Sequence, residues 1–99
     1  MFVMNALHSM CGDGTTPYEL SFYGEYTVEK FLQEVLEKRS NEHGSINFHA
    51  PGTMFGIPGC YYRDGKITKP MEEEYLKKKI VKAKAVGGWF LMDYLLWVE

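Results

Sequence analysis

Hydrophobic residues between positions 28 and 39 recur at the spacing of an α-helix. Intervals of three and four residues place them along one stripe of a helix with about 3.6 residues per turn. Thr27 can cap the first turn, and Tyr26 can pack on Phe31 as a hydrophobic staple. The pattern therefore predicts an amphipathic helix over residues 28–39, with a buried stripe formed by Val28, Phe31, Leu32, Val35 and Leu36.

Two segments before this helix alternate between hydrophobic and polar residues, as does a β-strand with one buried face. They cover residues 2–7 and 18–23. Between them, the run Cys11-Gly12-Asp13-Gly14 is rich in residues that favour turns. These segments predict an amino-terminal β-hairpin.

Shorter alternating segments follow the helix. Residues 45–49 predict a strand that ends before Pro51, because proline cannot donate a hydrogen bond to a sheet. Residues 60–62 and 66–68 flank an Asp64-Gly65 pair, which is a strong signal for a hairpin turn. We therefore expect one strand directly after the helix and a second hairpin further along the chain.

Two other segments have the composition of connections. Residues 50–59 contain two prolines and three glycines, which predicts a loop. Pro70 precedes three glutamates at positions 72–74. This predicts a short helical turn with proline at its first position and acidic residues at its positive end.

The two final predicted elements are strands. Residues 75–86 suit a helix because acids precede lysines, but from Ile80 onward apolar residues alternate with lysines. We favour a strand from Ile80, because a strand places the lysines on one face whereas a helix would interrupt its apolar stripe with them. Gly87-Gly88 then predicts a tight turn into a strand over residues 89–98. Both faces of that strand are apolar, which indicates the centre of a sheet.

This order of elements predicts a single α+β domain over residues 1–99, in which one amphipathic helix packs on a mixed or antiparallel sheet. In the order hairpin, helix, strand, hairpin and terminal strand, the chain resembles the ubiquitin-like β-grasp proteins. Three segments carry this resemblance: residues 2–23, the helix entry at 27–32, and Asp64-Gly65-Lys66. The resemblance implies a β-grasp-like fold and a module that binds proteins rather than an enzyme.

Composition and charge narrow the classes of function. The chain is 45% hydrophobic and 24% charged, which is typical of globular proteins. Its 11 basic and 13 acidic side chains give a net charge of -2, whereas nucleic-acid binding usually needs a strong positive field. We interpret the lysines at positions 77, 78, 79, 82 and 84 as a solvated face. No apolar segment reaches the length of a membrane span. From the net charge and the lack of such a segment, we expect neither nucleic acid nor a membrane as the partner.

Cysteine and histidine residues offer limited chemistry. Two cysteines, Cys11 and Cys60, are too few for the disulfide framework of a small secreted domain, which predicts a cytoplasmic location. Together with His8, His43 and His49 they could form a zinc site, but only His8 and Cys11 have the close spacing of paired ligands. We therefore expect no metal and no cofactor.

A thiol nucleophile can be built from Cys11 in its glycine-rich turn, with His8 or His49 as the base. Asp13 lies close by in the sequence and disfavours the thiolate, and no residue is marked as an oxyanion donor. We therefore keep a small thiol enzyme as an alternative and assign no catalytic residue.

Aromatic residues make up 15% of the chain and indicate binding. A single helix covers one face of a sheet, so the other face would expose an apolar patch formed by Trp89, Leu91, Leu95 and Trp97. The loop over residues 50–59 could instead fold back and cover that face. A further use of this loop is recognition, in which it inserts into a partner or closes over a ligand through Met54, Phe55 and Ile57.

These observations predict a small non-catalytic module or inhibitor-type protein that binds an unidentified protein partner, or itself as a homodimer. The alternative of a different class is a small-molecule or nucleotide binder, which closes loop 51–59 over a ligand stacked on Tyr61, Tyr62 or Trp89. The candidate binding residues are Met54, Phe55, Ile57, Tyr61, Tyr62, Trp89, Leu91 and Trp97.

Overall fold

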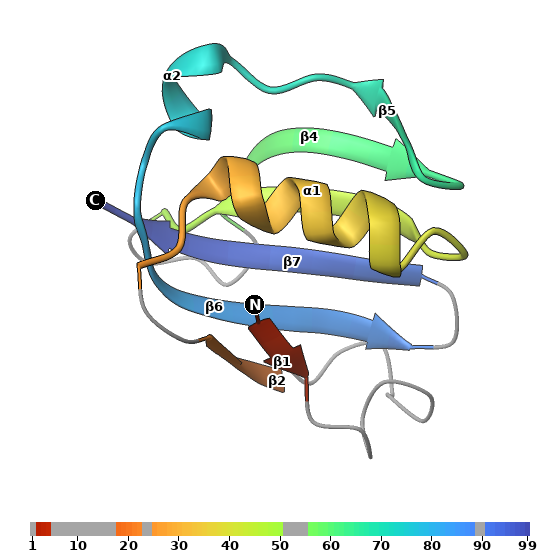
Figure 1. The fold of residues 1–99 in the computed structure, drawn as a ribbon, viewed down its shortest axis with the longest axis horizontal. Helices are drawn as coiled ribbons and strands as arrows, with labels where there is room; N and C mark the ends of the chain where they lie inside the picture. Colours follow the sequence, from red (N-terminus) through yellow and green to blue (C-terminus); the bar gives the residue numbers. More distant parts are fainter. Residues whose placement is uncertain (1, 5–17, 23–24, 51–55, 89–90) are drawn as a thin grey trace.

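An 11-residue helix lies across one face of a mixed sheet (Figure 1). The computed structural model describes residues 2–4, 18–22, 25–50, 56–88 and 91–99. The elements in this part of the chain are β1 (Phe2–Met4), β2 (Tyr18–Phe22), α1 (Val28–Lys38), β3 (His43–Phe48), β4 (Ile57–Arg63), β5 (Lys66–Lys69), α2 (Glu73–Leu76), β6 (Ile80–Gly88) and β7 (Leu91–Val98).

The sheet has the strand order β1-β2-β6-β7-β3-β4-β5 in the described part of the chain. All neighbouring strands are antiparallel except β3 and β7, which run parallel. β7 is therefore the middle strand, as its two apolar faces predicted. The α+β class, with one main helix on a mixed sheet, is confirmed. No helix among the described residues is long and apolar enough to cross a membrane.

Helix α1 begins where its sequence signals predicted. Oγ1 of Thr27 accepts a hydrogen bond from the Lys30 N–H at 3.3 Å, which caps the first turn. The rings of Tyr26 and Phe31 meet edge to face, with 6.4 Å between their centroids. The helix ends at Lys38, close to its predicted limit. Cap and staple together fix the angle at which the chain enters the helix.

The core fills the layer between α1 and the sheet. Phe31 is fully buried, and its ring meets the Tyr94 ring edge to face at a centroid distance of 5.1 Å. Burying one such aromatic side chain stabilises the fold by roughly 1.5–3 kcal/mol. The other large, fully buried side chains of this core are those of Ile46, Met92, Leu96, Val28, Val35 and Cys60.

A buried carboxylate ties the end of α1 to the middle of the sheet. Oε1 of Glu42 accepts a hydrogen bond of 2.8 Å from the Tyr94 hydroxyl, and Oε2 lies 3.3 Å from Nη1 of Arg39. The Tyr62 hydroxyl donates a hydrogen bond of 2.7 Å to the carbonyl oxygen of Met92. Burial is the largest cause that raises the pKa of both tyrosines, so both act as neutral donors at neutral pH.

The predicted loop over residues 50–59 is wrong at residues 57–59, because these residues belong to strand β4. They pair with the end of β3, and the register shifts just before the point where Pro58 meets Asn47. Such a bulge tolerates a residue that cannot donate to the ladder, so proline is accommodated within the strand. Residues 51–55 of the predicted loop lie outside the described residues.

The glycine pair near the end of β6 also differs from its prediction. Gly87 and Gly88 do not form a tight turn but extend the strand, where they pair with Met92 and Leu91. Gly87 has a φ of +140°, and a Cβ there would lie 2.2 Å from the Leu91 carbonyl oxygen. Both the backbone conformation and the close approach therefore require glycine. The predicted start of the last strand, at residues 89–90, lies outside the described residues.

The segment around α2 is part helix and part strand. Pro70 does not take the first helical position as predicted, because α2 begins at Glu73 and Glu72 is its N-cap. The strand predicted from Ile80 is confirmed, since β6 begins there. The amino-terminal hairpin is also confirmed, because β1 pairs antiparallel with β2, while its predicted turn lies outside the described residues.

Candidate functional site

The face of the sheet opposite α1, which we call the back face, presents polar and charged residues. Side chains alternate along a strand, so register pairs bring residues of neighbouring strands onto the same face. Ser45 pairs with Asp93 on one side and Tyr61 on the other, and these three lie on the back face. The next row toward the start of β3 is formed by Leu91, His43 and Arg63.

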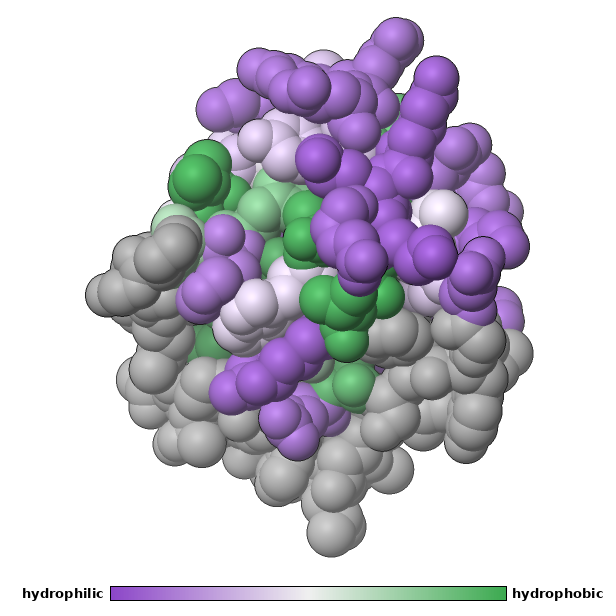
Figure 2. All heavy atoms as spheres, turned by 90° about the vertical axis from the view of Figure 1, so that its left-hand side faces the viewer, coloured by the Kyte–Doolittle hydropathy of each residue, from purple (hydrophilic) through white to green (hydrophobic). Residues whose placement is uncertain are grey.

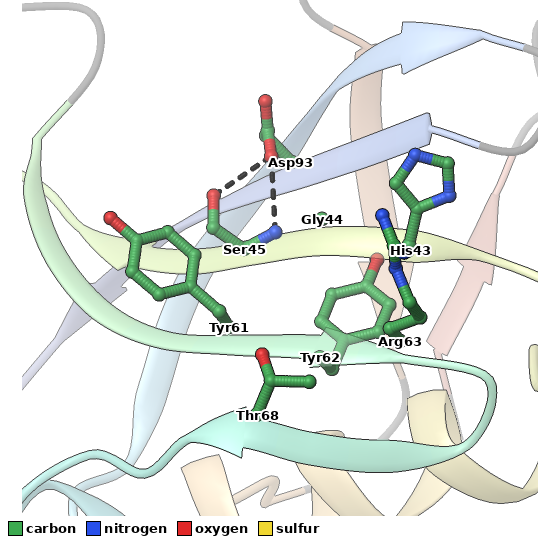
Figure 3. A pocket seen from close by; sticks show the side chains of 8 residues that line it. All are labelled: His43, Gly44, Ser45, Tyr61, Tyr62, Arg63, Thr68 and Asp93. Carbon is green, nitrogen blue, oxygen red and sulfur yellow. Dashed lines mark hydrogen bonds between the residues drawn. The ribbon is translucent and has the colours of Figure 1, made fainter.

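A hollow of about 600 Å³ opens beside these rows, lined by eight residues from β3, β4, β5 and β7 (Figure 3). Figure 3 shows Ser45 and Asp93 joined by hydrogen bonds in one part of its lining. His43 and Arg63 lie close together in another part, as their register pairing requires. The hollow therefore combines a hydrogen-bonded acidic group with a separate group of donors.

Ser45 and Asp93 form a fixed polar floor. Oδ1 of Asp93 accepts hydrogen bonds from the Ser45 N–H at 3.0 Å and from the Ser45 hydroxyl at 2.8 Å. Nδ2 of Asn47 donates to Oγ of Ser45 at 2.9 Å and to the carbonyl oxygen of Tyr94 at 3.1 Å. The Ser45 proton thus points to a carboxylate and not to a histidine base, so the group serves to hold positions rather than to activate the serine.

Arg63 makes one end of the hollow electropositive, and the neighbouring His43 ring adds a further N–H donor. They are register partners on β3 and β4. Neither side chain has a carboxylate within ion-pair distance among the described residues. Adjacent donors of this kind suit an anionic group, because a guanidinium presents several N–H donors in a fixed plane.

A second group lies further along the back face, around Trp97. The His49 ring stacks on this side chain with 4.7 Å between the ring centroids. Nζ of Lys82 lies 5.0 Å, and Nζ of Lys84 5.8 Å, from the centroid of the Trp97 ring, which is the range of cation–π contacts. Lys82 also lies 3.9 Å from a carboxylate oxygen of Glu19. Trp97 is therefore half-buried among cationic side chains rather than part of an apolar patch.

The remaining lysines of the predicted solvated cluster lie between α2 and the start of β6. Nζ of Lys79 is 3.0 Å from a carboxylate oxygen of Glu25, and Nζ of Lys78 is 6.0 Å from the ring centroid of Tyr75. Figure 2 views the molecule from the side on which β7 ends, and hydrophilic side chains cover much of its upper part there. Lys78 and Lys79 have local partners, whereas Lys82 and Lys84 project onto the back face.

The predicted binding residues have different surroundings. Leu91 is 48% exposed on the back face, and Tyr61 is 40% exposed where it lines the hollow. Ile57 is 54% exposed at the start of β4. Tyr62 lines the hollow but is buried, with its ring in the core. The other candidates, which lie outside the described residues, are Met54, Phe55 and Trp89.

Leu95, predicted to belong to an exposed patch, is buried. A Cβ on Gly56 would lie 2.6 Å from Cδ1 of Leu95 and 2.1 Å from the Phe48 carbonyl oxygen, so the chain at Gly56 passes directly over these atoms. Gly56 has a φ of +68°, which also favours glycine. This end of the predicted loop therefore lies against Leu95, whereas Met54 and Phe55, which were predicted to cover the face, lie outside the described residues.

Thiol and metal chemistry find little support in the described part of the chain. Cys60 is buried, and burial raises the pKa of its thiol from 9.0 to about 11, so the thiol stays protonated at neutral pH. Cys11 and His8, on which the predicted alternatives depend, lie outside the described residues. No group of three or more metal-binding side chains occurs among the described residues.

Sequence reasoning missed the polar residues that build the hollow. Asp93 interrupts an otherwise apolar central strand, and a charge in such a strand signals a specific partner. Ser45 and Arg63 carry no comparable signal, because pairing between strands alone brings them to the hollow. The sequence signals that pointed toward this face were Tyr61, Leu91, Trp97 and the lysine alternation of β6.

No protein-family model, curated protein or solved structure matches this chain. The resemblance to ubiquitin-like β-grasp proteins therefore stays a prediction that rests on the order of the elements. The geometry of the back face is the basis on which a function can be proposed.

Proposed function

We propose that this protein is a small non-catalytic module, β-grasp-like in fold, that binds another protein through the back face of its sheet. One observation carries the proposal. Within the described residues, α1 packs on one face of the sheet, whereas the opposite face holds the exposed side chains of Leu91 and Tyr61 beside an open hollow. Exposed aromatic and apolar side chains flanked by polar residues are typical of protein-binding surfaces.

The shape of the back face supports a protein partner. Small-molecule sites are mostly enclosed cavities with apolar walls. The hollow is instead open, and its floor is the hydrogen-bonded pair of Ser45 and Asp93 on two neighbouring strands. A rigid floor of this kind lowers the entropy lost on binding, because the polar groups are already in position.

Strand β5 offers a second means of contact. It is an edge strand of the described sheet and pairs with β4 on one side. An extended segment of a partner can pair with such an edge through backbone hydrogen bonds. Thr68 of β5 also lines the hollow, so a segment bound at this edge would lie beside the back face.

One observation favours a second function, the binding of a small molecule or nucleotide. Tyr61, one of the rings that this alternative names, lines the hollow and is 40% exposed. Nζ of Lys69 lies 5.3 Å from the ring centroid of Tyr61. The phosphate of a nucleotide would pair with Lys69, and its base would displace the lysine from the Tyr61 ring in order to stack there.

An inhibitor-type role and a cytoplasmic location belong to the same proposal. A rigid sheet face with exposed side chains can occupy the binding site of another protein, as an inhibitor does. The buried Cys60 thiol forms no disulfide, which supports a reducing compartment.

A charge placed at Leu91 tests the proposed surface. Leu91→Glu adds a carboxylate to the back face, and Gln33→Glu adds the same charge to the exposed side of α1 as a matched control. Both positions are exposed, so we expect the melting temperature of each variant to stay close to that of the wild type. Each protein is immobilised and incubated with a lysate of its source organism, and the retained proteins are identified by mass spectrometry.

We expect the wild type and Gln33→Glu to retain the same partner and Leu91→Glu to lose it. The proposal is wrong if the wild type retains nothing above bare beads, or if Leu91→Glu retains the wild-type set. Circular dichroism spectra of all three proteins separate a loss of binding from a loss of folding.

A further inference from the structure

Positive charge gathers on the back face, although the chain as a whole has a net charge of -2. Five cationic residues pair in register with residues that we have placed on the back face, so they lie on that face too. We call these five residues the cation band. Only two carboxylates on the described strands, those of Glu19 and Asp93, share the face. The cation band consists of Arg63, Lys66, Lys69, Lys82 and Lys84.

Among the residues that the structure describes, most of the cation band has no carboxylate partner. Lys82 and Glu19, 3.9 Å apart, are the one such pair that the described residues place on this face. Oδ1 of Asp93 already accepts two hydrogen bonds from Ser45. The other four cations leave a positive field, which steers an oppositely charged partner to this face and is neutralised when that partner binds.

The aromatic rings beneath the cation band argue against a nucleic acid as the occupant. Single-stranded nucleic acid binds by stacking its bases on open aromatic faces. Trp97 is already stacked by His49 and approached by two lysines, and Lys69 lies over Tyr61. These rings hold the ammonium groups in place, which reduces the side-chain entropy lost when the same groups bind carboxylates.

The cation band also opposes a symmetric contact between two copies of the chain. A two-fold interface sets a surface against its own copy, so lysines would face lysines. We infer that the back face binds an acidic segment of a protein partner, whose carboxylates pair with the cation band. This inference rests on the proposed function and names the chemistry of its partner. Where His43 adjoins Arg63 in the hollow, one carboxylate of the segment meets two donors.

Two synthetic peptides test the requirement for charge. One alternates glutamate with tyrosine, and its matched control alternates glutamine with tyrosine. Fluorescence anisotropy of the labelled peptides measures their affinity for the full chain. We expect the acidic peptide to bind at least about tenfold more tightly, with an affinity that falls as salt is added, because salt screens ion pairs on an exposed surface.

Paired substitutions locate the binding on the molecule. Lys82→Gln with Lys84→Gln removes two cations from the cation band, and Lys30→Gln with Lys38→Gln removes two from α1 as the matched control. We expect the first pair to weaken acidic-peptide binding about three- to tenfold and the control pair to change it less than about twofold. Arg63→Gln tests the other end of the cation band and should weaken binding in the same direction.

Equal affinity for the two peptides, no binding of the acidic peptide, or an equal effect of the control pair would each overturn the inference. Tighter binding of a single-stranded oligothymidine than of the acidic peptide would overturn it in favour of nucleic acid. In each case the lysate experiment with Leu91→Glu decides the proposed function separately, so the two failures can be told apart.

Discussion

Three side chains in the core hold a proton that the unfolded chain releases more easily. Cys60, Tyr62 and Tyr94 are buried, and desolvation is the largest cause that raises the pKa of each. For a group whose folded pKa is raised, the linked stability is complete below the unfolded pKa and is lost as the pH rises through the folded pKa. At alkaline pH, all three groups therefore lower the free energy of unfolding as the pH rises.

We expect the free energy of unfolding to fall as the pH rises above 9.0, because the Cys60 thiol ionises from there in the unfolded chain but only near about 11 in the folded protein. The thiol alone should account for a loss of about 2 kcal/mol by the upper end of that range. Urea denaturation at neutral pH and across the alkaline range measures this. Cys60→Ala should give a shallower decline, and a decline as steep as that of the wild type would exclude the thiol as a contributor.

The parallel pair of β3 and β7 carries the floor of the hollow, and the two strands approach closely at Gly44. A Cβ on Gly44 would lie 2.1 Å from the carbonyl oxygen of Met92, and Gly44 has a φ of +151°. The same carbonyl accepts the hydrogen bond of Tyr62. A side chain at this position would therefore separate the strands and disturb a buried hydrogen bond.

Gly44→Ala should lower the free energy of unfolding by about 2 kcal/mol or more, since strain and a disturbed buried hydrogen bond act together. Urea denaturation measures the change, with Ser40→Ala as a control at an exposed position that should stay within about 0.5 kcal/mol of the wild type. Equal stability of the Gly44→Ala variant and the control would show that the strand pair can relax around a methyl group.

Elements with a clear period could be predicted from the sequence. The stripe of α1 and its cap at Thr27 depend on neighbours within a few residues, and such local signals survive whatever the rest of the chain does. The apolar faces of β7 correctly indicated a central strand. The alternation after Ile80 also separated strand from helix correctly.

Elements whose limits depend on tertiary contacts could not be predicted. Residues 57–59 have the composition of a loop, yet pairing with β3 and a bulge make them part of a strand. Gly87 and Gly88 have the composition of a turn, yet they extend β6 because β7 passes too close for side chains. Proline and glycine signal an irregular backbone, and only the partner strand decides between a bulge, a close approach and a turn.

At the scale of the molecule, the site depends on strand order. The alternation of β6 predicted that its lysines share a face, and the register confirms this for Lys82 and Lys84. Arg63 joins them on one face only because the strands lie in the order β6-β7-β3-β4. The alternation of residues along each strand does not reveal this order. The sequence therefore indicated which side chains favour binding, but it did not indicate the hollow or the positive charge of the back face around it.

The charge of the back face leads to a prediction about the state of the molecule in solution. The sequence predicted a homodimer through a face with Trp89, Leu91 and Trp97. The ammonium groups of two lysines, however, lie against the Trp97 ring. We now expect a monomer by light scattering after gel filtration, because a two-fold contact there would oppose like charges. A dimer that Leu91→Glu disperses and Gln33→Glu leaves intact would restore self-association through this face.

The central position of β7 has a consequence for folding kinetics. Within the described sheet, β7 alone joins the half formed by β1, β2 and β6 to the half formed by β3, β4 and β5. A hairpin such as β4–β5 closes within about 1–10 μs, whereas pairing β3 with β7 brings together Ser45 and Asp93, 48 positions apart. Closing so long a loop loses entropy before contacts compensate for it. The rate-limiting step should therefore be the insertion of β7 between two partly formed halves, and substitutions in its core residues should slow refolding more than they speed unfolding.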